Sequence, residues 1–488
     1  MSDPYAAIAE THISTVFFAG DRAYKLLKPV RTGFLDHSTT EQRAVACRRE
    51  VELNRRFAPD VYLGVSEIRE NDVVADHLIV MRRQPSDRRL SRLLTTSERD
   101  DAVRQVARAV AVIHAAQLPD DRAGELAGRD ALAALWEHNF TEMQSFVGTF
   151  LAPDVFAEIR ALTTEYLAGR NALFAARVAG GFARDGHGDM LADDIFCLPD
   201  GPRVLDCLAF DDDLRLGDVL LDVAFLVMDL ERRAGPDVAA TFVRWYEEFS
   251  NEHHPQSLAD HYVAYRALVR AKFNCLRAEQ GAEGAAHEAD DLLHMVLAHL
   301  RAARTRLVIV GGAPGTGKST TARGLCAATG YSLLTSDEVR KDLAGIAHNQ
   351  HAFAGLGEGI YEPSMSDRVY VELIARAQTL LGLGESVVID ASWTTAESRA
   401  RARTAAGAEH AEIVEFRCVL DPDMAAARIE RRLAEGNDLS DATPEIARRL
   451  AAGAAPWTEA VDLDTSAADE VAVVTRALGR LQLAARSA

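Results

Sequence analysis

The sequence predicts a two-domain α/β protein in which a doubly wound, mainly parallel sheet follows a domain of α+β structure. The chain has 488 residues, which is more than one hydrophobic core usually organises. After residue 304, short apolar strands alternate with helical segments, and this alternation is typical of parallel sheets. Before that point, short strands come first and long helices follow. We therefore expect one domain over residues 1–303 and a second over residues 304–488.

The composition argues against several classes of partner and environment. The formal net charge is −19, because 54 Lys and Arg face 73 Asp and Glu, and this disfavours non-specific binding to nucleic acid or anionic lipid. No signal peptide and no apolar stretch long enough to span a bilayer stands out in the sequence. The six cysteines are scattered without a C-x-x-C pair, so we expect neither a zinc site nor disulfides. These features predict a cytoplasmic protein without a membrane partner.

The first domain begins with a predicted β-hairpin. Residues 15–18 and 22–26 are strand-like runs that flank the tight turn Ala-Gly-Asp. A helix is predicted over residues 41–57 and a strand over residues 77–81. From residue 90 onward helical periodicity dominates, so a small β-rich lobe is expected to precede a helical lobe.

A loop with chemistry-bearing residues interrupts the helical lobe. It contains the sequence His-Gly-Asp at 187–189, and residues 203–206 form a predicted short strand that ends in a carboxylate. The next apolar run, residues 214–230, has helical spacing. We expect this helix to pack under the loop as core, with Asp218 and Asp222 bracing the loop rather than reacting.

A β-rich lobe, a hinge strand and a helical lobe with a His-Gly-Asp loop resemble the aminoglycoside-phosphotransferase branch of the protein-kinase-like fold. The resemblance implies roles for four residues of the first domain. Lys25 matches the lysine that clamps the nucleotide, and Glu50 matches its ion-pair partner on the following helix. Asp189 matches the catalytic aspartate that takes the proton of the acceptor hydroxyl, and Asp206 matches a metal-binding aspartate.

The first domain also departs from this family pattern. The family's second metal ligand is an asparagine five residues after the catalytic aspartate, where this chain has Asp194. Asp194 can bind Mg²⁺ as an asparagine does, but it adds a negative charge beside Asp189 and Asp206. Two interpretations stay open. The domain is an active phosphotransferase, or its fold is retained for binding or regulation, with Lys25 and Glu50 as a surface pair and Asp194 as a loop cap.

The second domain begins with a strand, a glycine-rich turn and a helix. Residues 307–310 form a short apolar strand, and the sequence from Gly312 to Ser319 fits G-x-x-x-x-G-K-[ST] without a mismatch. A helix is predicted from Thr320, so the motif stands in the context that it needs. In such a turn the main-chain N–H groups bind phosphate oxygens, and the helix N-terminus adds positive potential.

This motif predicts a site for ATP and Mg²⁺. Lys318 would reach the β- and γ-phosphates, and the Ser319 hydroxyl would take one Mg²⁺ position. The residues assigned to nucleotide binding are Gly312, Ala313, Pro314, Gly315, Thr316, Gly317, Lys318, Ser319 and Thr320. The alternative is a glycine-rich turn that matches by chance, which the flanking strand and helix disfavour.

Polar residues follow the other predicted strands of the second domain. Those strands lie at 332–335, 386–389, 413–420 and 461–464. Ligands of doubly wound sheets bind at the carboxyl ends of the strands, so we assign Asp390 to Mg²⁺ and Asp337 as the general base for an acceptor hydroxyl. Arg340 lies one helical turn after Asp337, on the same face. Alternatively, Asp337 caps the helix and Arg340 is solvated, although Ser336 is also available as a cap.

A predicted helix and loop form a basic lid over this site. The helix carries Arg428, Arg431 and Arg432 and leads into the loop 435–443. Such arginines neutralise charge on the transferring phosphoryl group and exclude water when the lid closes. The alternative for each of them is a charged, solvated helix face.

With these residues, the second domain resembles the small P-loop kinases described as AAA-type predicted kinases, which are related to polynucleotide kinase, zeta toxins and gluconate kinase. The resemblance implies that Asp337 activates the acceptor hydroxyl and that Arg340 holds an acceptor phosphate. We expect an ATP- and Mg²⁺-dependent phosphotransferase that acts on a small-molecule or nucleotide-like hydroxyl, with the first domain as a second or vestigial kinase. The alternatives are an ATP-binding switch without a dedicated acceptor, and a polynucleotide or nucleotide-sugar kinase of the toxin type.

Overall fold

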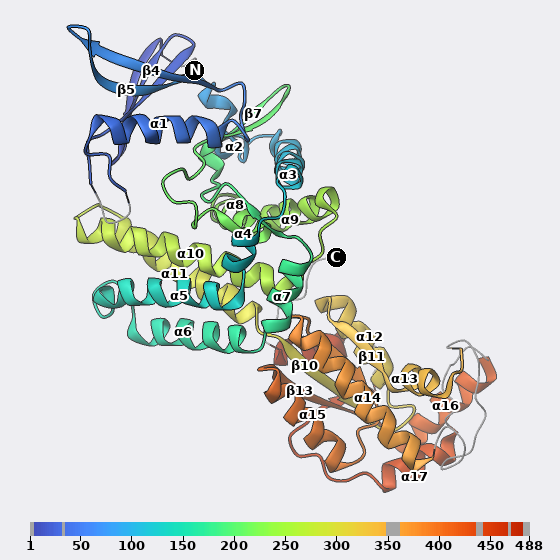
Figure 1. Ribbon diagram of the computed structural model, residues 1–488. Coiled ribbons are helices and arrows are strands. Elements are labelled where there is room, and N and C mark those ends of the chain that lie inside the picture. The colour runs from blue at the N-terminus through green and yellow to red at the C-terminus, as the bar shows by residue number, and fades with distance from the viewer. Residues whose placement is uncertain (1–3, 32–34, 348–361, 436–442, 467–469, 482–488) are drawn as a thin grey trace. The chain divides into compact units, whose positions relative to one another are not determined.

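The computed structural model divides the chain into two compact units (Figure 1). The structure describes residues 4–31, 35–347, 362–435, 443–466 and 470–481. The first unit comprises Met1–Phe156, Phe174–His254 and His261–Leu297, and the second comprises Ala157–Leu173, Pro255–Asp260 and Ala298–Ala488. The second unit thus takes in two short segments, and residues 298–303, that the prediction assigned to the first domain, and the domain boundary after residue 303 stays a prediction.

A five-stranded antiparallel sheet opens the first unit. Its order is β1-β2-β3-β5-β4. The strands are β1 (Ala6–Glu10), β2 (Ser14–Ala19), β3 (Arg22–Leu27), β4 (Tyr62–Glu70) and β5 (Val73–Arg82). The predicted hairpin is confirmed as β2 and β3, and Gly20 adopts a φ of 57° in its turn, a backbone region that glycine enters without strain. β1 and β4 were not predicted.

The helix α1 (Thr40–Asn54) packs on this sheet. Thr39 and Gln42 form a capping box at its start, which satisfies two N–H groups that the helix leaves open. The buried helix residues Cys47 and Val51 belong to the same hydrophobic core as Ile79 of β5. The predicted helix, 41–57, begins one residue later than α1 and runs three residues past its observed end. The Asn54 side chain donates to the Glu50 carbonyl at 3.0 Å in the last turn.

The rest of the first unit is helical, apart from two small sheets. Between β5 and β10 the chain forms the helices α2 (Leu90–Leu93), α3 (Arg99–Ala116), α4 (Asp121–Leu126), α5 (Arg129–Met143), α6 (Pro153–Ala168), α7 (Asn171–Ala179), α8 (Val219–Ala234), α9 (Pro236–Ser250), α10 (Gln256–Glu279) and α11 (Ala285–Ala302). Most of α6, the start of α10 and the end of α11 belong to the second unit. The small sheets pair β6 (Ala183–Asp185) with β9 (Leu216–Asp218) and β7 (Ile195–Leu198) with β8 (Gly201–Val204). In the described part of the chain no helix has both the length and the apolar surface to cross a membrane.

The second unit contains a five-stranded parallel sheet of order β11-β12-β10-β13-β14. Its strands are β10 (Arg306–Gly311), β11 (Ser332–Thr335), β12 (Val387–Asp390), β13 (Glu412–Val419) and β14 (Val461–Asp464). The connecting helices are α12 (Lys318–Thr329), α13 (Ser336–Ala344), α14 (Pro363–Gly382), α15 (Ala396–Ala408), α16 (Pro422–Glu435), α17 (Pro444–Ala452) and α18 (Glu470–Arg480). All five predicted strands and their parallel pairing are confirmed. The predicted two-domain α/β fold class is therefore confirmed.

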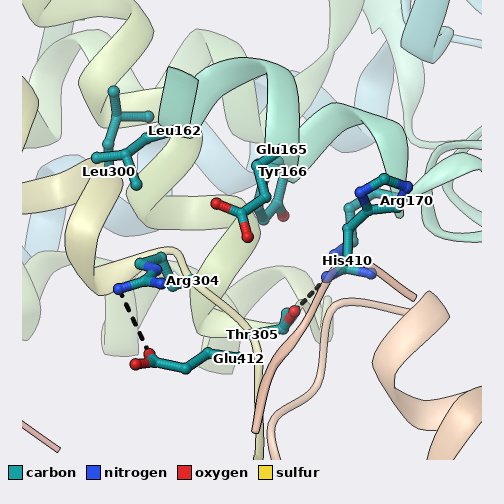
Figure 2. Close-up of a pocket in the computed structure, with 9 residues that line it drawn as sticks. All are labelled: Leu162, Glu165, Tyr166, Arg170, Leu300, Arg304, Thr305, His410 and Glu412. Atoms are coloured by element: carbon teal, nitrogen blue, oxygen red, sulfur yellow. Dashed lines mark hydrogen bonds and ion pairs between the residues drawn. The ribbon is translucent and has the colours of Figure 1, made fainter. Parts of the chain in front are cut away.

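A small pocket lies in the second unit at the edge where β10 and β13 begin (Figure 2). Arg170 is completely buried there and donates to the carbonyl oxygens of Gly169 and Glu409 at 2.6 and 3.1 Å and to the Thr305 hydroxyl. Its guanidinium thus joins segments that are distant in sequence. Parallel α/β sheets bind ligands at the carboxyl ends of their strands, so this amino-end pocket is not the candidate site.

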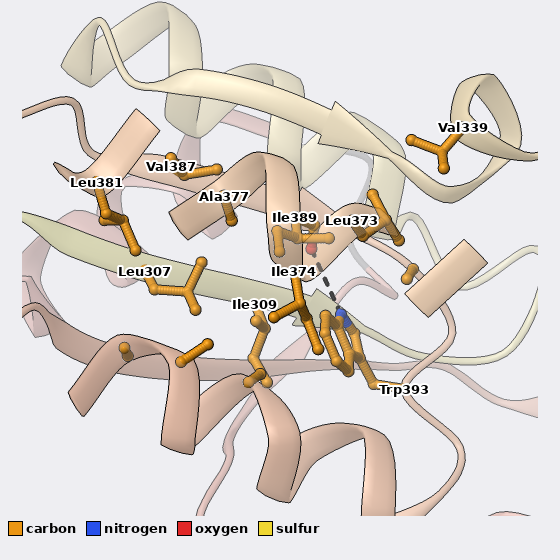
Figure 3. Close-up of a cluster of buried hydrophobic side chains, with 14 of the residues drawn as sticks. Leu307, Ile309, Val339, Leu373, Ile374, Ala377, Leu381, Val387, Ile389 and Trp393 are labelled. Atoms are coloured by element: carbon orange, nitrogen blue, oxygen red, sulfur yellow. Dashed lines mark hydrogen bonds between the residues drawn. The ribbon is translucent and has the colours of Figure 1, made fainter. Parts of the chain in front are cut away.

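The core of the second unit covers both faces of the sheet. Leu307 and Ile309 of β10 face one cluster, together with Leu373 of α14 and the almost fully buried Trp393 (Figure 3). The alternate residues of β10 face a second cluster with helices α12 and α18. Because β10 is buried on both faces, it reads as a continuous apolar run, and its polar chemistry is confined to the carboxyl end.

Candidate active sites

The turn between β10 and α12 forms a cradle that only glycine can build. Gly312, Gly315 and Gly317 have φ angles of 140°, 84° and 86°, which L side chains rarely adopt. Gly317 is also the N-cap of α12, and no side chain of the described residues caps that helix end. The uncapped helix N-terminus and the bare turn offer main-chain N–H groups for an anion. Lys318 and Ser319 stand half-buried at this point in the first turn of α12.

A side chain at Gly315 is incompatible with the observed shape of this turn. A Cβ there would stand 2.6 Å from the main-chain oxygen of Ala425. We expect Gly315→Ala to lower the stability by about 1–3 kcal/mol through backbone strain and overpacking and to weaken ATP binding at least about tenfold. Chemical denaturation and calorimetric titration with ATP–Mg²⁺ measure both. Gly407→Ala is the control, because a Cβ in that helix meets nothing within 4 Å, and ATP affinity unchanged in both variants would contradict the role of the cradle.

Hydrogen bonds from outside the motif fix the shape of the turn. The Thr316 hydroxyl donates to the Ala313 carbonyl at 2.8 Å, and the Thr465 hydroxyl donates to the Thr316 carbonyl at 2.7 Å. Arg428 of α16 donates to the Thr465 carbonyl at 2.7 Å and lies 3.7 Å from the Cβ position of Gly317. The predicted lid residue Arg428 is thus beside the phosphate turn. Thr465 follows the last strand of the sheet, and its part in the turn was not predicted.

Asp390 ends the strand next to the phosphate turn. It pairs in register with Val310 of β10 and with Thr335 of β11, so all three stand at one edge of the sheet. Asp390 is 6% exposed, and its Oδ1 atom has no hydrogen-bond partner among the described residues. A buried carboxylate oxygen without a partner is costly, and a cation or a water of its hydration shell would satisfy it. This donor set fits Mg²⁺, together with Ser319.

The metal would have to take most of its ligands from water and phosphate. Within the described ranges, no three His, Cys, Asp or Glu side chains gather closely enough to hold a metal ion. Mg²⁺ usually keeps several waters and is held by one or two protein groups plus substrate phosphates. A site built from one carboxylate and one hydroxyl therefore agrees with Mg²⁺ that arrives with a nucleotide.

The segment after Asp390 is tied to the phosphate turn. Trp393 has a φ of 51° and is 1% exposed. Its main-chain N–H donates to the Tyr370 hydroxyl at 2.9 Å. The same hydroxyl lies 3.1 Å from the Ser392 hydroxyl, while the Gly312 N–H donates to the Ser392 carbonyl at 3.3 Å. These bonds lock the end of β12 to the start of the turn. None of these contacts was predicted.

The structure changes the interpretation of α13. The N-cap is Thr335, whose hydroxyl accepts from the Glu338 N–H at 3.2 Å, so neither Asp337 nor Ser336 caps the helix. Asp337 stands half-buried in the first turn. Arg340 is 9% exposed and donates to the Ser366 hydroxyl at 3.4 Å. The alternative of Asp337 as a cap and Arg340 as a solvated side chain is therefore wrong, and their catalytic roles stay predictions.

The remaining lid residues also stay predictions. Arg431 is exposed and Arg432 is half-buried on α16, where Ile429 is completely buried. Residues 436–442 of the predicted lid loop lie outside the described residues.

In the first unit, Lys25 joins two carboxylates. Its Nζ lies 2.8 Å from Glu50 on α1 and 2.7 Å from Asp206 after β8. The side chains of Lys25 and Glu50 are only 12% and 10% exposed, so the alternative of a surface pair is wrong. Burial opposes the charged lysine, yet the Asp206 and Glu50 carboxylates hold the pKa of Lys25 well above its usual value. The ammonium of Lys25 in turn lowers the pKa of Asp206.

The helix α8 holds the His-Gly-Asp loop in place. The Asp222 carboxylate accepts from the main-chain N–H groups of His187 and Gly188 at 2.8 and 2.7 Å and lies 3.1 Å from His114 Nε2. Burial acts to raise the pKa of Asp222, but hydrogen bonding from His114 holds this pKa below its usual value. Asp222 thus braces the loop as predicted. Asp218 instead pairs with Arg177 at 2.6 Å.

Three carboxylates of this loop influence one another. The Oδ1 atom of Asp189 is buried without a hydrogen-bond partner in the described part of the chain, and burial raises the pKa of Asp189. Burial, with the charges of Asp206 and Asp189, raises the pKa of Asp194 to about 7. The predicted clustering of charge is therefore present. The absence of a group of three potential ligands in the described residues means that a metal at Asp194 and Asp206 also needs ligands from a nucleotide.

Comparisons with known proteins fit these observations. Residues 307–456 match the family described as "AAA domain", which confirms the predicted P-loop domain. The uncharacterized protein Rv2004c of Mycobacterium tuberculosis is 40% identical over 478 residues, which cover 96% of this chain and 94% of that protein. Among solved structures, a gluconokinase from Sinorhizobium meliloti is 17% identical over 37% of this chain and 92% of its own, with a TM-score of 0.27. A choline/ethanolamine kinase family protein from Mesorhizobium loti is 13% identical. The match covers 61% of this chain and 92% of that protein, with a TM-score of 0.38.

Proposed function

The chain belongs to the family of the Mycobacterium tuberculosis protein Rv2004c, and we propose that it is an ATP- and Mg²⁺-dependent phosphotransferase of the cytoplasm. The second unit would move the γ-phosphoryl group of ATP to a hydroxyl of a small-molecule or nucleotide-like acceptor. The observation that supports this proposal is the juxtaposition of the glycine cradle at 312–317 with an oxygen of Asp390, at the end of the adjacent strand, that has no partner among the described residues.

Each residue of the second unit has a defined part in this proposal. The turn and Lys318 would hold the phosphates in a fixed position, and phosphoryl transfer depends mainly on such positioning and on electrostatics. Ser319 and Asp390 would hold Mg²⁺, which neutralises phosphate charge when it is bound. Asp337 would take the proton of the acceptor hydroxyl, and Arg340 would bind the acceptor. Arg428 is held beside the turn by its hydrogen bond to the Thr465 carbonyl. Its positive charge would neutralise negative charge on the transferring phosphoryl group.

A second candidate activity belongs to the first unit. The observation that supports it is the ion-paired set in which Lys25 contacts both Glu50 and Asp206, the arrangement that places a nucleotide in protein-kinase-like folds. Asp189 would act there as the base.

An ADP-release assay on the full chain tests both activities. Wild type, Lys318→Ala, Asp189→Asn and the double variant are compared over sugars, aminoglycosides, nucleosides and RNA or DNA ends. We expect the acceptor-dependent ADP release of the second unit to be lost in Lys318→Ala, and any release that remains from the first unit to be lost in the double variant. ATP binding without any acceptor-dependent release in the wild type would instead favour the nucleotide-dependent switch. Labelling of polynucleotide ends with radiolabelled ATP would identify the polynucleotide-kinase alternative.

A further inference from the structure

Two arginines of α10 stand on one helix face near the His-Gly-Asp loop. Arg266 and Arg270 are four residues apart, and residues at this spacing share a face. Arg266 is 9% exposed, donates to the Leu221 carbonyl of α8 at 3.0 Å, and its guanidinium carbon lies 4.2 Å from the ring centroid of Phe225. Arg270 is half-buried, one turn further along the helix.

Neither arginine has an anionic partner among the residues that the structure describes. No ion pair is formed by Arg266 or Arg270, and Arg270 makes no hydrogen bond to a described residue. Another buried arginine of this unit, Arg177, pairs with Asp218 at 2.6 Å and with Glu252 at 2.5 Å. The carboxylates of Asp222 and Asp189 act on Arg266 without forming an ion pair with it. A buried cation without a counter-charge in contact is costly, so the space beside these arginines suits an anion that the protein chain does not supply.

The two arginines and the candidate base act on the same space. Asp189 carries a buried oxygen that no hydrogen bond satisfies in the described part of the chain. Against the effect of burial, the charges of Arg270 and Arg266 lower the pKa of the Asp189 carboxyl. Arg266 donates to the carbonyl of Leu221, the residue before Asp222, and Asp222 holds the main chain of His187 and Gly188. Arg266 therefore stands beside the base of the loop that carries Asp189, and Arg270 follows one turn along α10. They would repel a cationic acceptor from this space and attract an anionic one.

We propose that the acceptor of the first unit is an anionic hydroxyl compound, whose phosphate or carboxylate group binds Arg270 and Arg266 while its hydroxyl lies against Asp189. This inference rests on the proposed kinase activity of the first unit, but not on that of the second. In the reaction, the acceptor oxygen forms a bond to the γ-phosphorus and the bond from that phosphorus to the β,γ-bridging oxygen breaks. The hydroxyl proton goes to Asp189, and ADP leaves. Arg270 acts as a residue that determines specificity.

Binding of inorganic phosphate tests the anion site directly. All proteins in the test carry Lys318→Ala, so that the turn of the second unit contributes equally to every titration. We expect Arg270→Gln to weaken phosphate binding at least about tenfold, and Arg270→Lys to retain most of the affinity, because lysine binds phosphate as a point charge. Arg277→Gln is the matched control on the same helix, since Arg277 is half exposed and already pairs with Glu288. Phosphate binding that is absent, or equal in Arg270→Gln and its parent, would overturn the proposal.

Matched pairs of neutral and anionic compounds then identify the charged group. Calorimetry in the same background compares glycerol 3-phosphate with glycerol, and gluconate with glucose. Tighter binding of the phosphate compound indicates a phosphorylated acceptor, and tighter binding of gluconate indicates a carboxylate. Either preference should disappear in Arg270→Gln. Equal binding within both pairs would overturn the proposal, whatever the result for ATP turnover by the second unit.

Discussion

Replacing Lys318 with alanine is expected to reduce ATP turnover by the second unit at least about 100-fold, the scale found when one preorganised charge-stabilising donor is lost. Lys318 is the first residue of α12 and follows Gly317 directly. Its ammonium is the positively charged side-chain group of the motif, and the sequence predicts that it reaches the β- and γ-phosphates. The glycine turn supplies only main-chain donors. The measurement is acceptor-dependent ADP release by the full chain that carries Asp189→Asn, so that the first unit is silent.

The control for this variant lies on the same helix. Arg323 is an exposed residue of α12, and Arg323→Ala removes a positive charge without touching the turn. ADP release should then stay close to that of the parent, because Arg323 is exposed and solvent and salt screen the charges of exposed side chains. Wild-type turnover in Lys318→Ala would show that the turn does not hold the phosphates, and it would remove the basis for the proposed function.

The phosphate turn could be predicted from the sequence because its chemistry is local. Gly312, Lys318 and Ser319 lie within eight residues, and the strand and helix on either side are confirmed. Buried parallel strands are also visible in sequence, since both faces of β10 are apolar. Asp390 followed from the same logic, because the carboxyl ends of parallel strands share one edge.

Contacts between distant segments could not be predicted in this way. Nothing in the sequence around Thr465 shows that its hydroxyl supports the Thr316 carbonyl, because that bond depends on the order of strands in the sheet. The link from Tyr370 to Trp393 has the same origin. Periodicity reports which face of an element is buried, but it does not report which element covers that face.

The first unit shows where a family resemblance adds information. Lys25 and Glu50 lie on a strand and a helix, and no spacing rule joins residues of different elements. The resemblance paired them, and the structure places them 2.8 Å apart. Neither the resemblance nor the sequence pattern indicated Arg270. Arginines at helical spacing usually form a solvated face, so the pattern alone predicts no binding role. Only burial and the lack of a counter-charge in the described residues separate this arginine from an ordinary surface residue.

Asp337→Asn is expected to retain ATP binding within about twofold and to lower phosphoryl transfer about 100-fold or more, the range of general base catalysis. Asparagine has almost the same shape but cannot take the proton of the acceptor hydroxyl. The fold should tolerate the change, because Thr335 rather than Asp337 caps α13, and one charge in a first helical turn contributes only about 0.3–1 kcal/mol. Calorimetry with ATP–Mg²⁺ and single-turnover transfer separate the two effects.

The neighbouring Glu338 provides the matched control for Asp337. It is an exposed residue of the same helical turn, and its carboxylate accepts from the Thr335 hydroxyl at 2.8 Å. Glu338→Gln removes an equal charge from the helix start and keeps an oxygen that can accept this bond. If the charge of the turn mattered more than proton transfer, both variants would lose activity alike. Transfer that survives in Glu338→Gln and fails in Asp337→Asn identifies Asp337 as the base, whereas unchanged transfer in Asp337→Asn would assign that role to another group.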